Sequence, residues 1–139
     1  MRQFLGSQTN RIDAKGRVSI PAAYRTSLRD ADGDIALILR PSSRRKCIEG
    51  WPTELFHALA TPTEKIDPFD DDLETRAMIF FGRAEIPVVD REGRMTLPAE
   101  LARHAGIGEE MMFIGLGRWF QIWEPGKGRL RLAEVEGAR

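Results

Sequence analysis

The chain has 139 residues, of which 42% are hydrophobic and 30% are charged, and its 21 basic and 21 acidic side chains cancel at pH 7. This length suffices for one ordinary domain or for two small halves that share a core. The sequence contains no apolar run of about 18 residues and no signal-peptide pattern, so we expect a cytoplasmic protein without a membrane span. The single cysteine, Cys47, excludes an internal disulfide and predicts a buried apolar side chain rather than a reactive group.

The charge is unevenly distributed along the chain. Residues 1–46 contain 10 basic and 4 acidic side chains, residues 47–90 contain 3 and 10, and residues 91–139 contain 8 and 7. Phosphate binding depends on the local charge of a surface rather than on the net charge of the whole chain. The excess of basic side chains in residues 1–46 therefore favours a nucleic-acid-binding surface in this segment. Its last basic residues, Arg44-Arg45-Lys46, either contact phosphates or are only solvated. The acidic run Asp70-Asp71-Asp72 is better explained as a helix N-terminus, where carboxylates suit the helix dipole.

A ten-residue motif occurs twice, 77 positions apart. The segment Asp13-Ala-Lys-Gly-Arg-Val-Ser-Ile-Pro-Ala22 returns as Asp90-Arg-Glu-Gly-Arg-Met-Thr-Leu-Pro-Ala99, in which Asp, Gly, Arg, Pro and the last Ala are identical. A repeat of this period indicates one supersecondary unit that is used twice.

Each repeat predicts a hairpin, a helix and two further strands. Asp at the first position and Gly at the fourth suit a three-residue hairpin turn that is closed by a left-handed glycine. The alternation after the turn predicts short strands at 18–20 and 95–97, and Pro21 and Pro98 then open short helices at 22–29 and 99–105, the second of which ends at Gly106. Further strands are predicted at 34–39, 47–49, 111–116 and 119–123.

The middle segment and the tail differ from the repeats. Helices are predicted at 53–59 and 70–81, joined by a proline-containing loop, and Leu73, Ala77 and Phe80 form an apolar stripe at helical spacing. These helices either pack on a neighbouring subunit or cover their own sheet. A half of this size is marginal by itself, which favours intertwined halves and an oligomer. The tail at 125–139 has little apolar content and predicts a short or frayed helix, or disorder.

The sequence offers no constellation for catalysis. His57 and His104 are isolated on predicted helices, and no set of three or four metal ligands has coherent spacing. No nucleotide-binding loop or nucleophile motif follows a strand. We therefore expect a protein that is not an enzyme and that has no metal or cofactor.

The motif Asp-x-x-Gly-Arg-(apolar)-x-(apolar)-Pro-Ala, present twice in a chain that opens with Phe4-Leu5-Gly6, resembles the MraZ family of bacterial transcriptional regulators. More widely it resembles the SpoVT-AbrB domain, which MraZ-like proteins carry in duplicate. The resemblance extends from Phe4 to about Trp123. It implies a mainly β fold with short α-helices, built as a duplicated swapped-hairpin AbrB-like β-barrel. The corresponding division is repeat 1 at 4–51, a helical linker at 52–80, repeat 2 at 81–124 and a C-terminal tail at 125–139.

The resemblance also implies a function. It suggests a sequence-specific regulator that binds double-stranded promoter DNA and represses the division and cell-wall cluster and its own operon. Such a protein is expected to form a ring-like homo-oligomer on short repeated elements and to be associated with the nucleoid. Two alternatives stay open: an AbrB-type antitoxin, and a ring-forming interaction protein that binds no nucleic acid.

The candidate DNA contacts are the basic residues in and beside the two turns: Arg11, Lys15, Arg17, Arg91 and Arg94. Lys15 is the clearest candidate because it is predicted at the tip of a hairpin and has no core to stabilise. Arg17 and Arg94 either pair with the aspartate four residues earlier or project to DNA, and the two roles are compatible. Glu92 replaces Lys15 in the second turn, which predicts weaker DNA contact there.

Overall fold

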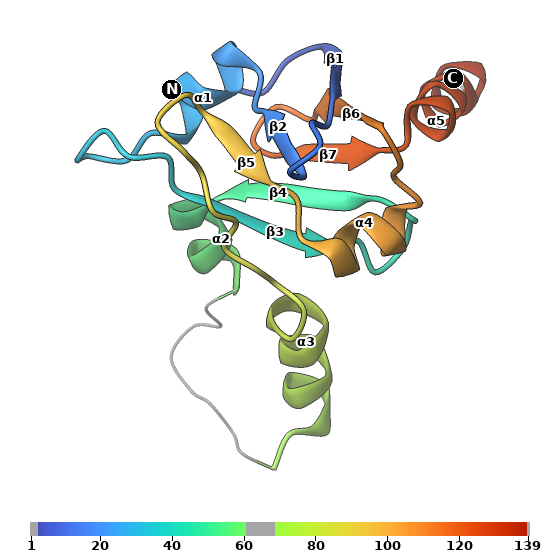
Figure 1. Cartoon of the computed structure of the whole chain (residues 1–139). Coiled ribbons are helices and arrows are strands. Elements are labelled where there is room, and N and C mark those ends of the chain that lie inside the picture. Colours follow the sequence, from blue (N-terminus) through green and yellow to red (C-terminus); the bar gives the residue numbers. More distant parts are fainter. Residues whose placement is uncertain (1–2, 61–68, 139) are drawn as a thin grey trace.

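The computed structural model describes residues 3–60 and 69–138, so most of the loop predicted between the two middle helices lies outside the described residues. Its elements follow the predicted order along the chain (Figure 1). They are β1 (Ser7–Arg11), β2 (Arg17–Ser19), α1 (Ala22–Leu28), β3 (Leu37–Pro41), β4 (Ile48–Pro52), α2 (Thr53–Ala60), α3 (Asp71–Phe81), β5 (Arg94–Thr96), α4 (Ala99–Ala105), β6 (Glu110–Gly115), β7 (Phe120–Trp123) and α5 (Pro125–Gly137).

The strands of the two repeats are interleaved. Five antiparallel strands form one sheet in the order β1-β6-β7-β4-β3, and β2 pairs with β5 in a separate two-stranded ladder. The β1–β6, β2–β5 and β4–β7 pairs each join one strand from each repeat. In the ladder, Val18 lies opposite Met95. Each repeat therefore needs strands of the other repeat as hydrogen-bonding partners.

The predicted hairpins form as turns. The strands on either side separate after the first turn, whereas at the second turn Val89 still forms an antiparallel bridge with Met95 and the amide of Thr96 donates to the carbonyl of Val88 at 3.0 Å. The amide of Asp13 donates to the carbonyl of Arg17 at 2.8 Å, after which β1 pairs with β6 and β2 pairs with β5. This exchange buries Val18 and Met95 against each other and the core. The predicted class, mainly β with short helices, agrees with the structure. The described strands form an open sheet and a separate ladder, however, and not the expected closed barrel.

Period-two alternation divides the strand residues between the two faces of the large sheet. On one face, Phe113 and Ile122 belong to the main core with Val18 and Met95 of the ladder. On the other face, Met112 packs with residues that are covered by α5. The ladder and α1 and α4, whose Tyr24, Leu28, Leu101 and Ala105 are buried, thus cover one face of the sheet, and α2 and α5 cover parts of the other.

The two middle helices behave differently. Helix α2 covers its own sheet, because Phe56 is buried against Ile38 and Trp51. Helix α3 has no buried residue and is attached at its C-terminal end, where the ring of Phe80 stacks on Phe56 at a centroid distance of 4.4 Å. The predicted stripe is the less exposed side of this helix. In Figure 1, α3 extends away from the rest of the molecule.

Arg40 anchors the end of α3 and is not a surface cation. Its Nε lies 2.8 Å from Oε1 of Glu49, one of its terminal nitrogens donates to the carbonyl of Ile79 at 3.2 Å, and its guanidinium lies 4.7 Å from the centre of the Phe80 ring. Its side chain is only 7% exposed. Arg40 is one of the ten basic side chains counted in residues 1–46, but because it is buried it adds little to the basic surface.

The tail is more ordered than its composition predicts. It forms the thirteen-residue helix α5, whose first turn is capped by the carboxylate of Glu124. Gly128 is buried, and a Cβ atom at this position would lie 2.9 Å from the sulfur of Met112 and 3.0 Å from Cβ of Trp123. The missing side chain thus lets the helix approach the sheet closely, which compensates for its low apolar content. No helix in the described part of the chain is long and apolar enough to cross a membrane.

Candidate nucleic-acid interface

The two turns of the repeated motif have the same internal geometry. In the first, Oδ1 of Asp13 accepts hydrogen bonds from the amides of Lys15 and Arg17, both at 2.9 Å, and Gly16 has a φ of 79°. In the second, Asp90 accepts from the amides at positions 92 and 94, both at 3.0 Å, and Gly93 also has a φ of 79°. Only glycine adopts this left-handed backbone at low cost. The predicted turn chemistry is therefore confirmed in both repeats.

Each turn aspartate also holds the arginine that follows the glycine. Nε of Arg17 lies 2.9 Å from Oδ2 of Asp13, and Nε of Arg94 lies 2.8 Å from Oδ2 of Asp90. The hydrogen bond from the backbone amide of the arginine is the main cause that lowers the pKa of each aspartate below its ordinary value of 3.8. Both carboxylates are thus charged at neutral pH and orient the guanidinium groups.

The aspartate pairing leaves donors for another acceptor. A guanidinium carries five N–H donors, and Arg17 uses only Nε in the pairing with Asp13. Its side chain is 31% exposed, so its terminal nitrogens can reach a phosphate or a base edge. Arg94 is similarly exposed, but one of its terminal nitrogens lies 3.5 Å from the carboxylate of Glu92. The second turn therefore offers fewer free donors than the first.

The predicted contact residues fall into two groups, one at each turn. Arg11, Lys15 and Arg17 belong to the first turn, and Lys15 is exposed at its tip as expected. Arg91 and Arg94 belong to the second turn, where Arg91 is also exposed. The terminal nitrogen of Arg11 lies 3.7 Å from the carboxylate of Glu109, whose side chain is 84% exposed, so this ion pair is weak.

The ladder connects the two groups. The amide of Ile20 donates to the carbonyl of Gly93 at 3.0 Å, and the amide of Leu97 donates to the carbonyl of Gly16 at 3.1 Å. Each strand thus ends on the turn of the other repeat. The two turns are therefore held in a defined relative position.

Two arginines of α1 also lie beside the second turn, although neither belongs to the repeated motif. Arg25 and Arg29 line a cleft of about 370 Å³ whose other charged residues are Asp34, Asp90, Arg91 and Glu92. A terminal nitrogen of Arg25 donates to the carbonyl of Ile20 at 2.7 Å. Two arginines and one aspartate from the first repeat therefore join the charges of the second turn. Only the exchange of strands brings α1 to this turn, so the linear motif carries no signal for it.

The run Arg44-Arg45-Lys46 lies beside α4 and does not extend either turn. Its three residues are exposed, and the carbonyl of Arg45 lies 3.1 Å from Nε2 of His104. The contact with His104 positions this exposed basic run beside α4.

Cys47 is fully buried, as the sequence predicts. Burial raises the pKa of its thiol to about 12, with a smaller contribution from the carboxylate of Glu49. The thiolate is the reactive form of cysteine, so this side chain is a packing residue at neutral pH.

Comparison with known proteins identifies the family. A family model described as "MraZ protein, putative antitoxin-like" matches residues 3–77 and 80–133. A protein named transcriptional regulator MraZ from Gluconacetobacter diazotrophicus is 48% identical over 137 residues, which cover 97% of this chain and 87% of the relative. A protein of the same name from Gluconobacter oxydans is 49% identical over 90% of this chain and 77% of its own length. One from Rickettsia bellii is 39% identical over 91% and 84%. The chain therefore belongs to the MraZ family.

Proposed function

We propose that this protein is a transcriptional regulator that binds double-stranded promoter DNA in a sequence-specific manner. The observation that carries the proposal is the pair of matched turns, each with an aspartate-oriented arginine that keeps terminal N–H donors, although Arg94 keeps fewer than Arg17. The printed names of the relatives, transcriptional regulator MraZ, support the same function. The proposed contacts are Arg11, Lys15 and Arg17 at the first turn and Arg91 and Arg94 at the second.

The proposed organisation follows the repeat. Repeat 1 spans 4–51, the helical linker 52–80, repeat 2 81–124 and the tail 125–139. The interleaved strand pairs support an AbrB-like swapped-hairpin relation between the two repeats. In this interpretation each chain presents both turns as one unit. We propose that it acts without a cofactor and is not an enzyme.

We also propose that several copies assemble as a ring and bind short repeated elements together. Linked sites gain effective concentration when the DNA can reach them at the same time, so weak contacts at each turn suffice. The proposed targets are the promoter of the division and cell-wall cluster and that of its own operon, which the protein represses. This role places it in the cytoplasm, on the nucleoid.

A mobility-shift titration at several salt concentrations tests the DNA-binding proposal. The probe is the promoter region of its own operon, and the control is a fragment of the same length with its short repeats shuffled. We expect tighter binding to the promoter and a log–log salt slope that grows by roughly 0.9 for each phosphate contact. Equal affinity for both fragments would contradict sequence-specific binding. A salt slope near zero would contradict the proposed phosphate contacts.

The description "antitoxin-like" of the matching family model favours a second candidate, an AbrB-type antitoxin. Such a protein sequesters its toxin through a disordered tail. Helix α5 argues against this role, because Pro125 and Gly128 are buried against the rest of the chain. Limited proteolysis distinguishes the two: rapid cleavage within 125–138 of the native protein supports the antitoxin, and resistance of this segment supports the regulator.

A further inference from the structure

The loop between β3 and β4 carries three consecutive basic residues, Arg44, Arg45 and Lys46, and all three are exposed. The backbone of this loop is held in place, because the hydroxyl of the buried Ser42 accepts hydrogen bonds from the amides of Arg44 and Arg45 at 3.2 and 3.1 Å. The amide of Ser42 donates to the carbonyl of Cys47 at 2.9 Å, which closes the loop. The three basic side chains therefore start from a defined backbone.

Helix α5 brings two further cations to this loop, Lys127 and Arg131. Burial raises the pKa of the Cys47 thiol to about 12, and the positive charges of Arg45 and Arg131 oppose this rise, so both arginines lie near the same residue. Lys127 precedes Arg131 by four residues, which places the two side chains next to each other on α5. A Cβ atom at Gly106, directly after α4, would lie 3.1 Å from Nζ of Lys127.

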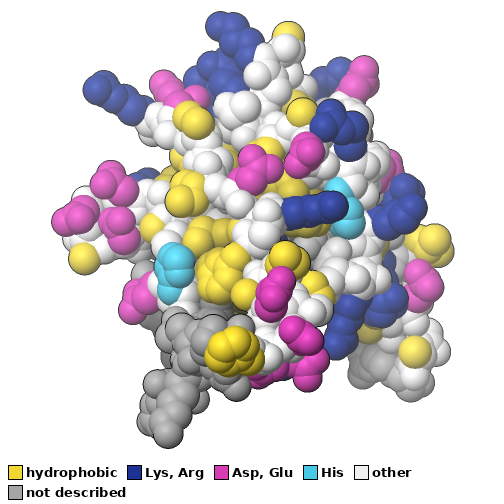
Figure 2. Space-filling model, turned by 90° about the horizontal axis from the view of Figure 1, so that it is seen from below, with side chains coloured by type: hydrophobic (Ala, Val, Ile, Leu, Met, Phe, Trp, Pro, Cys, Tyr) yellow, Lys and Arg dark blue, Asp and Glu magenta, His cyan; other side chains and the backbone are white. Residues whose placement is uncertain are grey.

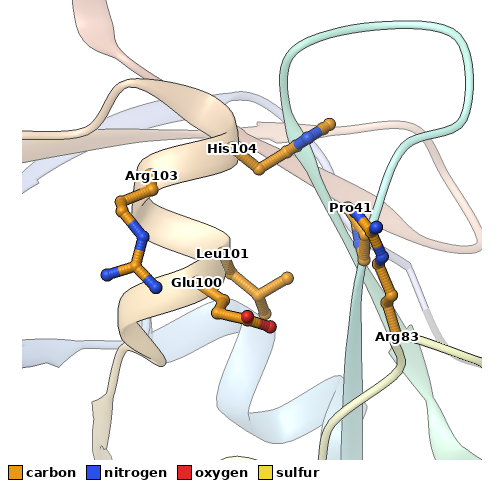
Figure 3. Close-up of a pocket in the computed structure, with 6 residues that line it drawn as sticks. All are labelled: Pro41, Arg83, Glu100, Leu101, Arg103 and His104. Carbon is orange, nitrogen blue, oxygen red and sulfur yellow. The ribbon is translucent and has the colours of Figure 1, made fainter.

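His104 of α4 lies at the same place, since its Nε2 is 3.1 Å from the carbonyl oxygen of Arg45. Figure 2, seen from below, shows Lys and Arg side chains on both sides of a histidine on the right of this face. Figure 3 shows His104 pointing from α4 toward the β3 side of a cleft, which Arg83 also lines. We call the five cations of the loop and of α5 the loop–helix surface: Arg44, Arg45, Lys46, Lys127 and Arg131.

The loop–helix surface has no carboxylate partner in the part of the chain that the structure describes, where none of its five cations forms an ion pair. Arg40 of the same β3–β4 hairpin, in contrast, is buried and lies 2.8 Å from Glu49. The equivalent hairpin of the second repeat closes with the shorter loop 116–119, which contains one basic residue, Arg118. The fold therefore does not require a basic run at this place.

The acids of the surrounding elements leave the loop–helix surface positive. Glu124 uses its carboxylate to cap α5, where it accepts from the backbone amide of Lys127 at 2.9 Å. Glu134 is an exposed residue of α5, and Glu100 lines the cleft beside His104. The dipole of α4 favours cations at its C-terminal end, such as Lys127, but does not account for the run in the loop. The five like charges repel one another, and an anionic partner relieves this repulsion.

We propose that the loop–helix surface binds the phosphate backbone of duplex DNA without reading its sequence. Gly106, beside Lys127, precedes Glu109 by only three residues, so their backbones lie within about 11 Å of each other. The carboxylate of Glu109 lies 3.7 Å from Arg11 of the first turn. A duplex held at the first turn therefore continues close to this surface. The inference rests on the proposed DNA binding and adds a sequence-independent contact to it.

Mobility-shift titrations of the full chain test this surface on two fragments of equal length, the promoter region and its shuffled control. The variants are Arg44→Ala/Lys46→Ala in the loop and Lys127→Ala on α5. We expect each variant to weaken binding to both fragments by the same factor, so that the preference for the promoter is unchanged. The log–log salt slope should decrease by about 0.9 for each phosphate contact that is removed.

The matched control is Arg76→Ala/Arg129→Ala, which removes two exposed cations outside the loop–helix surface. Arg76 belongs to α3, and Arg129 points to the opposite side of α5 because it lies two residues from Lys127. The control is expected to keep the affinity and the salt slope of the unmodified protein, and circular dichroism checks that all variants are folded. An equal decrease of the slope in the control would overturn the proposal, because any lost cation would then have this effect.

Failure of this surface and failure of the proposed function give different results. If the unmodified protein prefers the promoter and the variants bind both fragments as it does, the regulator is supported and the loop–helix surface is wrong. If the unmodified protein binds both fragments equally and the variants bind both more weakly, the surface is supported and sequence-specific regulation is contradicted. Variants that lose binding to phosphatidylglycerol vesicles but not to DNA would assign the surface to membrane phosphates and overturn the proposal.

Discussion

The amide of Ile20 donates a hydrogen bond to the carbonyl oxygen of Gly93, 3.0 Å away in the other repeat. The equivalent bond, from Leu97 to Gly16, is 3.1 Å long. These two reciprocal contacts make each turn a support for the strand of the opposite repeat. A change in one turn is therefore transmitted to the other through the β2–β5 ladder.

The two turn glycines should respond differently to substitution. Both have a φ of 79°, so an alanine side chain costs roughly 1–2 kcal/mol at either position. At Gly16 the space for a Cβ atom is open, whereas at Gly93 it would lie 2.2 Å from Cδ of Arg25. We expect Gly93→Ala to lower the free energy of unfolding by more than Gly16→Ala does, as measured by urea denaturation.

A double-mutant cycle identifies the source of this difference. Arg25→Ala removes the collision, so the extra cost of Gly93→Ala should disappear in the Arg25→Ala background. The cost of Gly16→Ala should be the same in both backgrounds. If the extra cost at Gly93 persists without the Arg25 side chain, the contact with Arg25 is not its cause.

The first turn should contribute more to DNA affinity than the second. Lys15→Ala and Arg17→Ala are each expected to weaken promoter binding and to reduce the salt slope by about one contact per affected site. Arg94→Ala should cost less, because Glu92 lies 3.5 Å from the guanidinium and repels phosphate. The measurement is the mobility-shift titration at several salt concentrations.

Arg129→Ala, on the exposed side of α5, is the control for loss of a positive charge and should leave affinity unchanged. Lys15→Ala should also leave the protein folded, since surface changes usually lie within about 0.5 kcal/mol. Undiminished affinity of both first-turn variants would show that the hairpin is structural, and DNA contact would then be sought at Arg44, Arg45 and Lys46.

The turn aspartates should titrate at low pH. Hydrogen bonds from the amide of Arg17 and its neighbours lower the pKa of Asp13 from 3.8. A lowered pKa in the folded state contributes stability that is present above pH 3.8 and is lost as the pH falls through the folded value. NMR of the side-chain carboxyl carbon should give midpoints below 3.8 for Asp13 and Asp90. A short peptide with the same turn sequence should titrate near 3.8, and equal midpoints in both samples would contradict the hydrogen bonding.

Cys47 should be protected from thiol reagents. Its pKa of about 12 leaves very little thiolate at neutral pH, and its side chain is fully buried. We expect no modification by iodoacetamide at pH 7.5 in the native protein and complete modification in urea, as measured by mass spectrometry. Rapid modification of the native protein would mean that the region around Cys47 and α5 opens readily.

Local chemistry explains which elements were predictable. The turn depends on an aspartate and a glycine three positions later, and the helices α1 and α4 depend on the proline that precedes each. These signals act within about five residues, so they can be read from the chain itself. The tail shows the limit of such reading, because the order of α5 depends on how closely Gly128 approaches Met112 and Trp123.

The candidate interface was predictable in part for the same reason. The two turns, with Lys15, Arg17, Arg91 and Arg94 within or beside them, follow from the order of the amino acids, because backbone hydrogen bonds to a nearby aspartate define these positions. The other charges that surround each turn come from distant parts of the chain and are positioned by folding. Exchange of strands between the repeats brings Arg25 and Arg29 to the second turn, and folding buries Arg40 beneath Phe80. These contacts join residues far apart in the chain, and they form because the two halves bury their apolar strands in one shared core.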